Sequence, residues 1–103
     1  MNIVITPSDK TNKKFKVVID DTKNNNKKTL HFGDSRYQDF TKHKDTERKK
    51  AYLARHKKDN ATNPNYAGFY STNLLWNKPT LKESIQATNR KYKNINIQLK
   101  SKT

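Results

Sequence analysis

Apolar and polar residues alternate in several stretches of the chain, and alternation with a period of two is typical of half-buried strands. Residues 14–21 place Phe15, Val17 and Ile19 on one face. Residues 27–33 follow an Asn-rich stretch, which predicts a hairpin with a long loop. Residues 94–100 alternate again. These three stretches predict the strands of a small sheet.

A fourth strand is predicted at the start of the chain. Residues 2–6 form a β-branched run that is closed by Pro7, and Pro7-Ser8-Asp9 reads as a turn. Because Pro cannot donate a hydrogen bond to a sheet ladder, the run predicts an edge strand.

The middle of the chain predicts helices. A basic helix is expected to begin at Thr41 or Asp45 and to run to about Lys58, since this stretch lacks Gly and Pro. Residues 69–76 form a dense apolar cluster that predicts a short helix. Thr80 and Glu83 fit a capping box, and apolar residues then recur at helical spacing to about residue 92.

The order of these elements predicts an α+β fold. We expect a small antiparallel sheet, made of an N-terminal hairpin plus a C-terminal strand, with two main helices and a short apolar helix. The length predicts a single small basic domain over residues 1–103. Residues 1–13 and 94–103 are expected to serve as docking strands or arms.

The net charge of the chain says more about the surroundings of the protein than any motif does. The chain carries 23 Lys and Arg against 9 Asp and Glu, a formal net charge of +14. Leu, Ile, Val and Phe make up only 19 of the 103 residues. A small core with strong self-repulsion predicts a protein held inside a larger assembly, beside a polyanion.

Other features limit where the protein acts. The chain has no Cys, which excludes disulfides and thiolate metal sites. No apolar run approaches the ~18 residues of a membrane span, and the first residues lack the pattern of a signal peptide. We therefore expect a soluble or peripheral protein made in the cytoplasm.

The predicted basic helix is the best candidate for a contact surface. Lys or Arg occupies 8 of the 17 positions from residue 42 to residue 58. The consecutive apolar residues 51–54 cannot all face one core, so something besides the domain itself is expected to cover this helix. The predicted partner or phosphate contacts are Lys42, Arg48, Lys49, Tyr52, Arg55 and His56.

No catalytic, cofactor or metal site is predicted. The three His residues and their Asp neighbours lack the i, i+4 spacing of helical metal motifs. Ser35 lacks the flanking glycines of a nucleophile elbow. Tyr66 and Tyr70 are the best candidates for stacking on bases. A chain so poor in aliphatic residues must also build its core from aromatics, so Trp76 is expected in the core.

A further set of residues carries a resemblance to a known group of proteins. These residues are Phe32-Gly33, Tyr37, Asp39-Phe40-Thr41, Lys44-Asp45, Arg48, Tyr52, Arg55-His56, Ala67-Gly68-Phe69, Leu75-Trp76 and residues 80–85. Over residues 14–90 the chain resembles a family of small uncharacterised basic proteins of large nucleocytoplasmic DNA viruses of algae and protists. The resemblance implies a protein of the virion, or of the virus factory in the host cytoplasm.

Two functional hypotheses remain at this point. The first is a non-enzymatic minor capsid protein that bridges capsid subunits and an anionic inner surface, with other virion proteins or the lipid headgroups of an internal membrane as partners. The alternative is a nucleic-acid-binding protein that packages viral DNA without sequence specificity.

Overall fold

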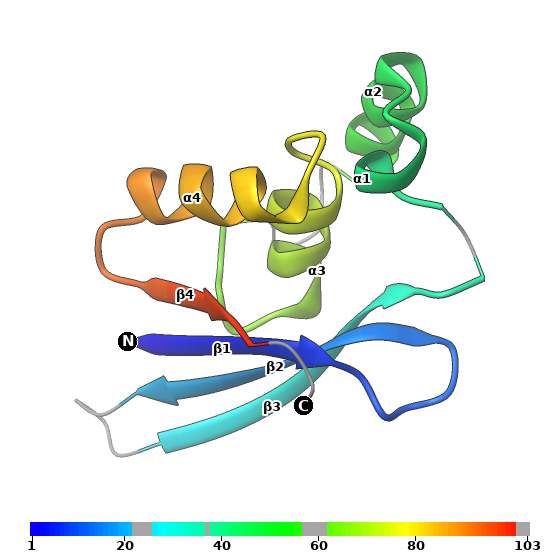
Figure 1. Ribbon diagram of the computed structural model, residues 1–103. Coiled ribbons are helices and arrows are strands. Elements are labelled where there is room, and N and C mark those ends of the chain that lie inside the picture. The colour runs from blue at the N-terminus through cyan, green and yellow to red at the C-terminus, as the bar shows by residue number, and fades with distance from the viewer. Residues whose placement is uncertain (22–25, 37, 57–61, 101–103) are drawn as a thin grey trace.

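The computed structural model describes residues 1–21, 26–36, 38–56 and 62–100. It confirms the predicted α+β class: a four-stranded sheet forms one layer and helices cover one of its faces (Figure 1). The elements in chain order are β1 Asn2–Pro7, β2 Lys13–Asp21, β3 Asn26–Asp34, α1 Phe40–His43, α2 Thr46–Arg55, α3 Ala67–Tyr70, the π-helical turn η1 Ser71–Leu75, α4 Leu81–Lys91 and β4 Asn96–Leu99.

The strand order is β3-β2-β1-β4, which corrects two sequence predictions. β1 lies in the interior of the sheet and not at its edge. Pro7 is the last residue of β1, so its missing N–H falls at the end of the hydrogen-bond ladder. The sheet is mixed and not antiparallel throughout, because β4 runs parallel to β1 with Ile97 opposite Ile3. The helices between these two strands supply the long crossover that a parallel pair needs.

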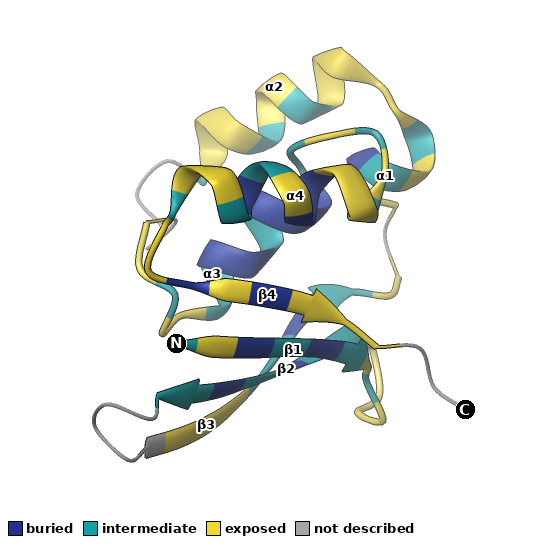
Figure 2. Ribbon diagram, turned by 60° about the vertical axis from the view of Figure 1, so that its left-hand side comes forward, coloured by how far each residue is buried: buried dark blue, intermediate teal, exposed yellow. Residues whose placement is uncertain are grey.

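The apolar positions of the strands point toward the helices. Ile3, Ile5, Val17, Ile19 and Phe32 are buried, whereas residues between them in the same strands are only half-buried or exposed, as Figure 2 shows. The predicted period of two therefore marks the covered face of the sheet. The expected arms at residues 1–13 and 94–103 contribute β1 and β4 to this sheet, and residues 101–103 lie outside the described part.

The second long helix begins where the capping box predicts. The Thr80 hydroxyl accepts a hydrogen bond from the Glu83 N–H at 3.1 Å and donates to the Glu83 carboxylate at 3.0 Å. Ile85 is buried against the core. The Asn89 amide pairs with both backbone groups of Ile97, at 2.9 and 3.1 Å, so α4 occupies part of the outer edge of β4.

The predicted short apolar helix is divided into α3 and η1. Phe69, Leu74 and Leu75 are buried, as expected for core residues. Tyr70 is also fully buried and its hydroxyl donates to the Pro64 carbonyl at 2.6 Å. This burial excludes Tyr70 as a candidate for stacking on bases, and it raises the pKa of the Tyr70 phenol well above the ordinary value.

The basic helix is interrupted near its start. Asp39 caps α1, Lys44 ends it in a left-handed conformation with φ of 55°, and Asp45 caps α2 through the N–H groups of Glu47 and Arg48. Of the two predicted starting points, Asp45 is confirmed for the main helix, whereas Thr41 lies inside α1. The predicted end at Lys58 falls outside the described residues.

Candidate functional site

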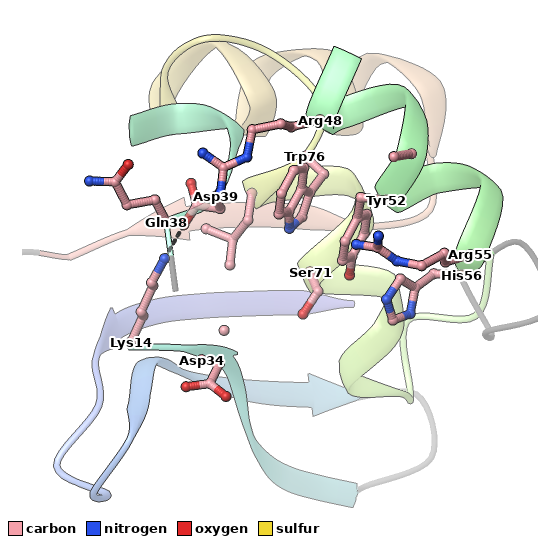
Figure 3. A pocket seen from close by; sticks show the side chains of 13 residues that line it. Lys14, Asp34, Gln38, Asp39, Arg48, Tyr52, Arg55, His56, Ser71 and Trp76 are labelled. Carbon is pink, nitrogen blue, oxygen red and sulfur yellow. Dashed lines mark hydrogen bonds and ion pairs between the residues drawn. The ribbon is translucent and has the colours of Figure 1, made fainter. Parts of the chain in front are cut away.

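A cleft of about 600 Å³ lies beneath α2. The end of β3 forms one wall with Gly33 and Asp34, and η1 and the residue after it form another with Leu75 and Trp76. Figure 3 shows side chains of α2 reaching over this space from above. The cleft exists because α2 has no buried residue and stands away from the sheet, as Figure 1 also shows.

Four of the six predicted contact residues line the cleft: Arg48, Tyr52, Arg55 and His56. Residues 48, 52 and 55 are four and three positions apart, so they occupy one stripe of α2 about 60° wide. In Figure 3 Arg48 extends to one side of Trp76, and Arg55 lies on the other side, near Tyr52 and His56. The helix therefore directs two guanidinium groups along the cleft.

The other two predicted contacts are not in this cleft. Lys49 Nζ donates to the Asn77 carbonyl at 2.5 Å and lies 4.9 Å from the centroid of the Phe40 ring, so it ties α2 to the rest of the domain. Lys42 is exposed on α1 and borders a separate hollow beside Pro79 and Leu81.

Stacked rings join α2 to the core. Tyr52 and Trp76 lie parallel, with centroids 4.2 Å apart and an angle of 3° between planes. His56 stacks on Tyr52 at 4.2 Å, and His43 lies 5.3 Å from Trp76. Trp76 packs against the core but is only partly buried, so the prediction that it lies in the core is only partly right. Because these rings face one another, the cleft does not offer them as open stacking platforms.

A buried ion pair forms the wall opposite the stacked rings. Lys14 Nζ lies 2.5 Å from Asp39 Oδ2, and the two side chains are only 15% and 4% exposed. The other Asp39 oxygen accepts the Thr41 N–H at 2.9 Å and the Thr41 hydroxyl. Asp39 therefore holds three groups at once and fixes the segment that leads from β3 into α1.

A second carboxylate of the cleft, Asp34, is also engaged. Arg36 donates to its two oxygens, from Nε at 3.0 Å and from Nη2 at 2.8 Å. These hydrogen bonds lower the pKa of Asp34 to about 2. Since both carboxylates are held by other cations, neither is available to neutralise Arg48 or Arg55.

The cleft-lining guanidinium groups thus carry a surplus of positive charge. Across the described ranges, the two ion pairs are Lys14 with Asp39 and Arg36 with Asp34, and neither includes a residue of α2. Such a site can bind an anion through charge-assisted, bidentate hydrogen bonds.

Sequence reasoning did not identify Lys14, Asp39 or Ser71 as residues of a site. They come from β2, from the segment before α1 and from η1, which lie far apart in the chain. One local signal was present, because Asp39 two residues before Thr41 has the form of a helix N-cap. No local signal marks the other two.

Two further observations concern the described part of the chain alone. In these ranges no three His, Asp or Glu side chains gather closely enough to share a metal ion. None of the helices there has the length and apolar character needed to cross a membrane.

Comparison with known proteins gives one match. A family model described as "Family of unknown function (DUF5754)" matches residues 3–56, which is just over half of the chain. The chain belongs to the DUF5754 family. Searches of curated proteins and of solved structures gave no match.

The DUF5754 match ends at the last cleft residue of the basic helix. It includes β1 from its second residue onward, the whole of β2 and β3, the Lys14–Asp39 pair and the whole of α2. Ser71, Leu75 and Trp76 follow the matched segment. The strand wall and the basic roof of the cleft thus belong to the DUF5754 segment, and the wall formed by Ser71, Leu75 and Trp76 is contributed by the rest of the chain.

Proposed function

We propose that the protein is a non-enzymatic structural protein of a virion, a minor capsid protein that docks through α2 and its cleft on an anionic partner. The observation that carries this proposal is that α2, a helix of ten residues, has no buried residue. Most helices of globular proteins bury an apolar stripe, so a helix left this open is well suited to be covered by another molecule.

The charge of α2 supports docking in preference to a purely solvated role. Arg48 and Arg55 face a concave space and have no carboxylate partner among the described residues. A helix needed only for solubility gains nothing from directing its guanidinium groups inward. The carboxylates in the cleft are both held in ion pairs, which favours binding over acid–base chemistry.

The place of action rests on the resemblance to proteins of large DNA viruses described above. A virion offers two negative surfaces, the packaged genome and an internal membrane, and a chain with a net charge of +14 is suited to lie against either. The same proposal places the protein in the host cytoplasm, in the virus factory, during assembly.

Sequence-nonspecific DNA binding is the second candidate, and a separate observation favours it. Lys42, Lys44 and Lys50 are exposed and form no ion pair within the described ranges. Exposed lysines of this kind can neutralise phosphates with little geometric demand. They lie outside the cleft, so DNA binding would use cations that docking in the cleft does not need.

Fractionation of gently disrupted virus particles tests the proposal. The protein is expected in the shell fraction, and its presence in the genome fraction, or its absence from particles, would contradict the proposal. Arg48→Ala and Tyr52→Ala should release the protein from particles, because a few residues carry most of a docking energy. Lys50→Ala is the matched control on the same helix and should be retained.

Duplex-DNA binding at several salt concentrations tests the alternative. If about four cations of α1 and α2 contact phosphates, log K should fall with log salt with a slope near −3.6. Equal small losses for Arg48→Ala and Lys50→Ala, together with this steep slope, would favour the packaging role over docking.

A further inference from the structure

The cleft beneath α2 combines two kinds of surface. Its walls include the apolar side chains of Leu75 and Trp76, and its roof, formed by α2, carries Ala51 between the guanidinium groups of Arg48 and Arg55. An occupant with apolar groups and more than one negative charge would complement both surfaces.

The cations that α2 contributes to the cleft are arginines, although the chain contains far more lysine than arginine. The chain has 19 Lys but only four Arg, and two of these four line the cleft. A third, Arg36, holds the cleft carboxylate of Asp34. Lys is a compact point charge, whereas the planar guanidinium of Arg matches a carboxylate or a phosphate with two parallel hydrogen bonds. The cleft therefore carries the chain's geometrically selective cations, and the bulk of its charge lies elsewhere.

The shape of the cleft and its rings disfavour a nucleic acid as the occupant. The Tyr52 ring is stacked between Trp76 and His56, and His43 lies near Trp76, so both faces of Tyr52 and one face of Trp76 are already occupied. A cleft of about 600 Å³ is suited to a few side chains of a peptide, while a duplex would contact only the outer face of α2.

The spacing of the two guanidinium groups fits an extended acidic chain. Arg48 and Arg55 are seven residues apart on one helix, about 10 Å along its axis. Carboxylates three residues apart on an extended or polyproline chain are separated by about 9–10 Å. An apolar side chain between them would then reach the floor of the cleft.

We propose that this cleft binds an extended acidic segment of a partner protein, with carboxylates three residues apart on Arg48 and Arg55 and an apolar side chain against Leu75 and Ala51. This inference rests on the proposed docking function and names the chemistry of the docked partner.

A peptide-binding assay tests it. The probe is a fluorescein-labelled peptide of repeated Glu-Leu-Pro triplets, which stays extended and places a carboxylate at every third residue; the matched peptide of repeated Gln-Leu-Pro triplets is the control. We expect fluorescence anisotropy to report saturable binding of the acidic peptide to the full chain and none of the neutral one.

Two conservative variants separate selective recognition from general charge. Arg48→Lys and Arg55→Lys keep the charge but lose the bidentate geometry, and each should weaken binding about tenfold. Lys50→Ala removes a charge on the opposite side of α2, about 200° from Arg48, and should change the affinity less than about twofold. Circular dichroism of each variant checks that α2 remains folded.

Three outcomes would overturn the inference. The first is equal weakening by Arg48→Lys and Lys50→Ala, and the second is no weakening by either arginine variant. The third is tighter binding of an oligothymidylate of the same net charge than of the acidic peptide. None of these results would affect the particle fractionation described above, so a failure of this inference is distinguishable from a failure of the docking function.

Discussion

The ion pair between Lys14 and Asp39 should be the most sensitive point in the wall of the cleft. Asp39 accepts hydrogen bonds from Lys14 and from the backbone and hydroxyl of Thr41, and it is only 3% exposed. Removing one partner of a buried pair leaves an uncompensated charge and costs about 3–5 kcal/mol. Since Lys14 keeps 15% exposure, we expect Asp39→Ala to lower the free energy of unfolding by about 3 kcal/mol, at the low end of this range.

Two further variants separate the contribution of the helix cap from the contribution of the ion pair. Asp39→Asn retains an oxygen that can cap α1 through Thr41, so it should be about 1 kcal/mol less harmful than Asp39→Ala. The double variant Lys14→Met with Asp39→Asn removes the orphaned charge and should recover part of the stability. The coupling energy of this pair is expected at about 1–3 kcal/mol.

Urea unfolding gives the measurement. Far-UV circular dichroism follows the whole domain, and the fluorescence of Trp76, the one Trp of the chain, follows the cleft. The reasoning is refuted if Asp39→Asn unfolds within ~0.5 kcal/mol of the unchanged protein, a difference typical of surface positions. It is also refuted if the double variant is no more stable than Asp39→Asn alone.

Four other predictions concern single residues. Tyr70→Phe removes a buried hydrogen bond and should lower the free energy of unfolding by about 1 kcal/mol. Because the folded state raises the pKa of Tyr70, the unchanged protein should lose stability as pH rises above about 10. Thermal melts should show a smaller loss of stability at alkaline pH in the variant. Asp34 has its folded pKa lowered from 3.8 to about 2, so its contribution is present above pH 3.8 and is lost as pH falls toward 2; urea unfolding across this window should find the loss reduced in Asp34→Asn. Gly33→Ala should cost about 1–3 kcal/mol, because φ is +80° and a Cβ would lie 2.8 Å from a leucine methyl group, and an unchanged melting temperature would contradict this. Trp76→Ala should lower the free energy of unfolding by about 2–3 kcal/mol, less than the loss of a fully buried Trp. A double-mutant cycle with Tyr52→Ala should give a coupling energy of about 0.5–1.5 kcal/mol for the ring stack. A coupling energy near zero would show that the stack does not hold α2.

Local patterns in the sequence determined the secondary structure to a large extent. The alternation of Phe15, Val17 and Ile19 identified β2 because a strand points successive side chains to opposite faces. Thr80 and Glu83 identified the start of α4 because a capping box satisfies N–H groups within a single turn. In both cases the residues that decide the conformation are neighbours in the chain.

Local patterns in the sequence identified only part of the candidate site. Arg48, Tyr52, Arg55 and His56 were found together because helical spacing places them on one side of α2. Lys49 was counted with them by its charge, but its contact with the Asn77 carbonyl is made across 28 residues of chain.

Tertiary structure alone decided which strands are neighbours and what faces α2. The parallel pairing of β1 with β4 joins residues more than 90 positions apart, and nothing in the β-branched run of β1 distinguishes an inner strand from an edge strand. The pairing of Lys14 with Asp39 and the stacking of Tyr52 on Trp76 likewise depend on how the segments pack. Local spacing sets the direction of a side chain from its own backbone, whereas the partner it meets is set by the burial of apolar surface over the whole domain.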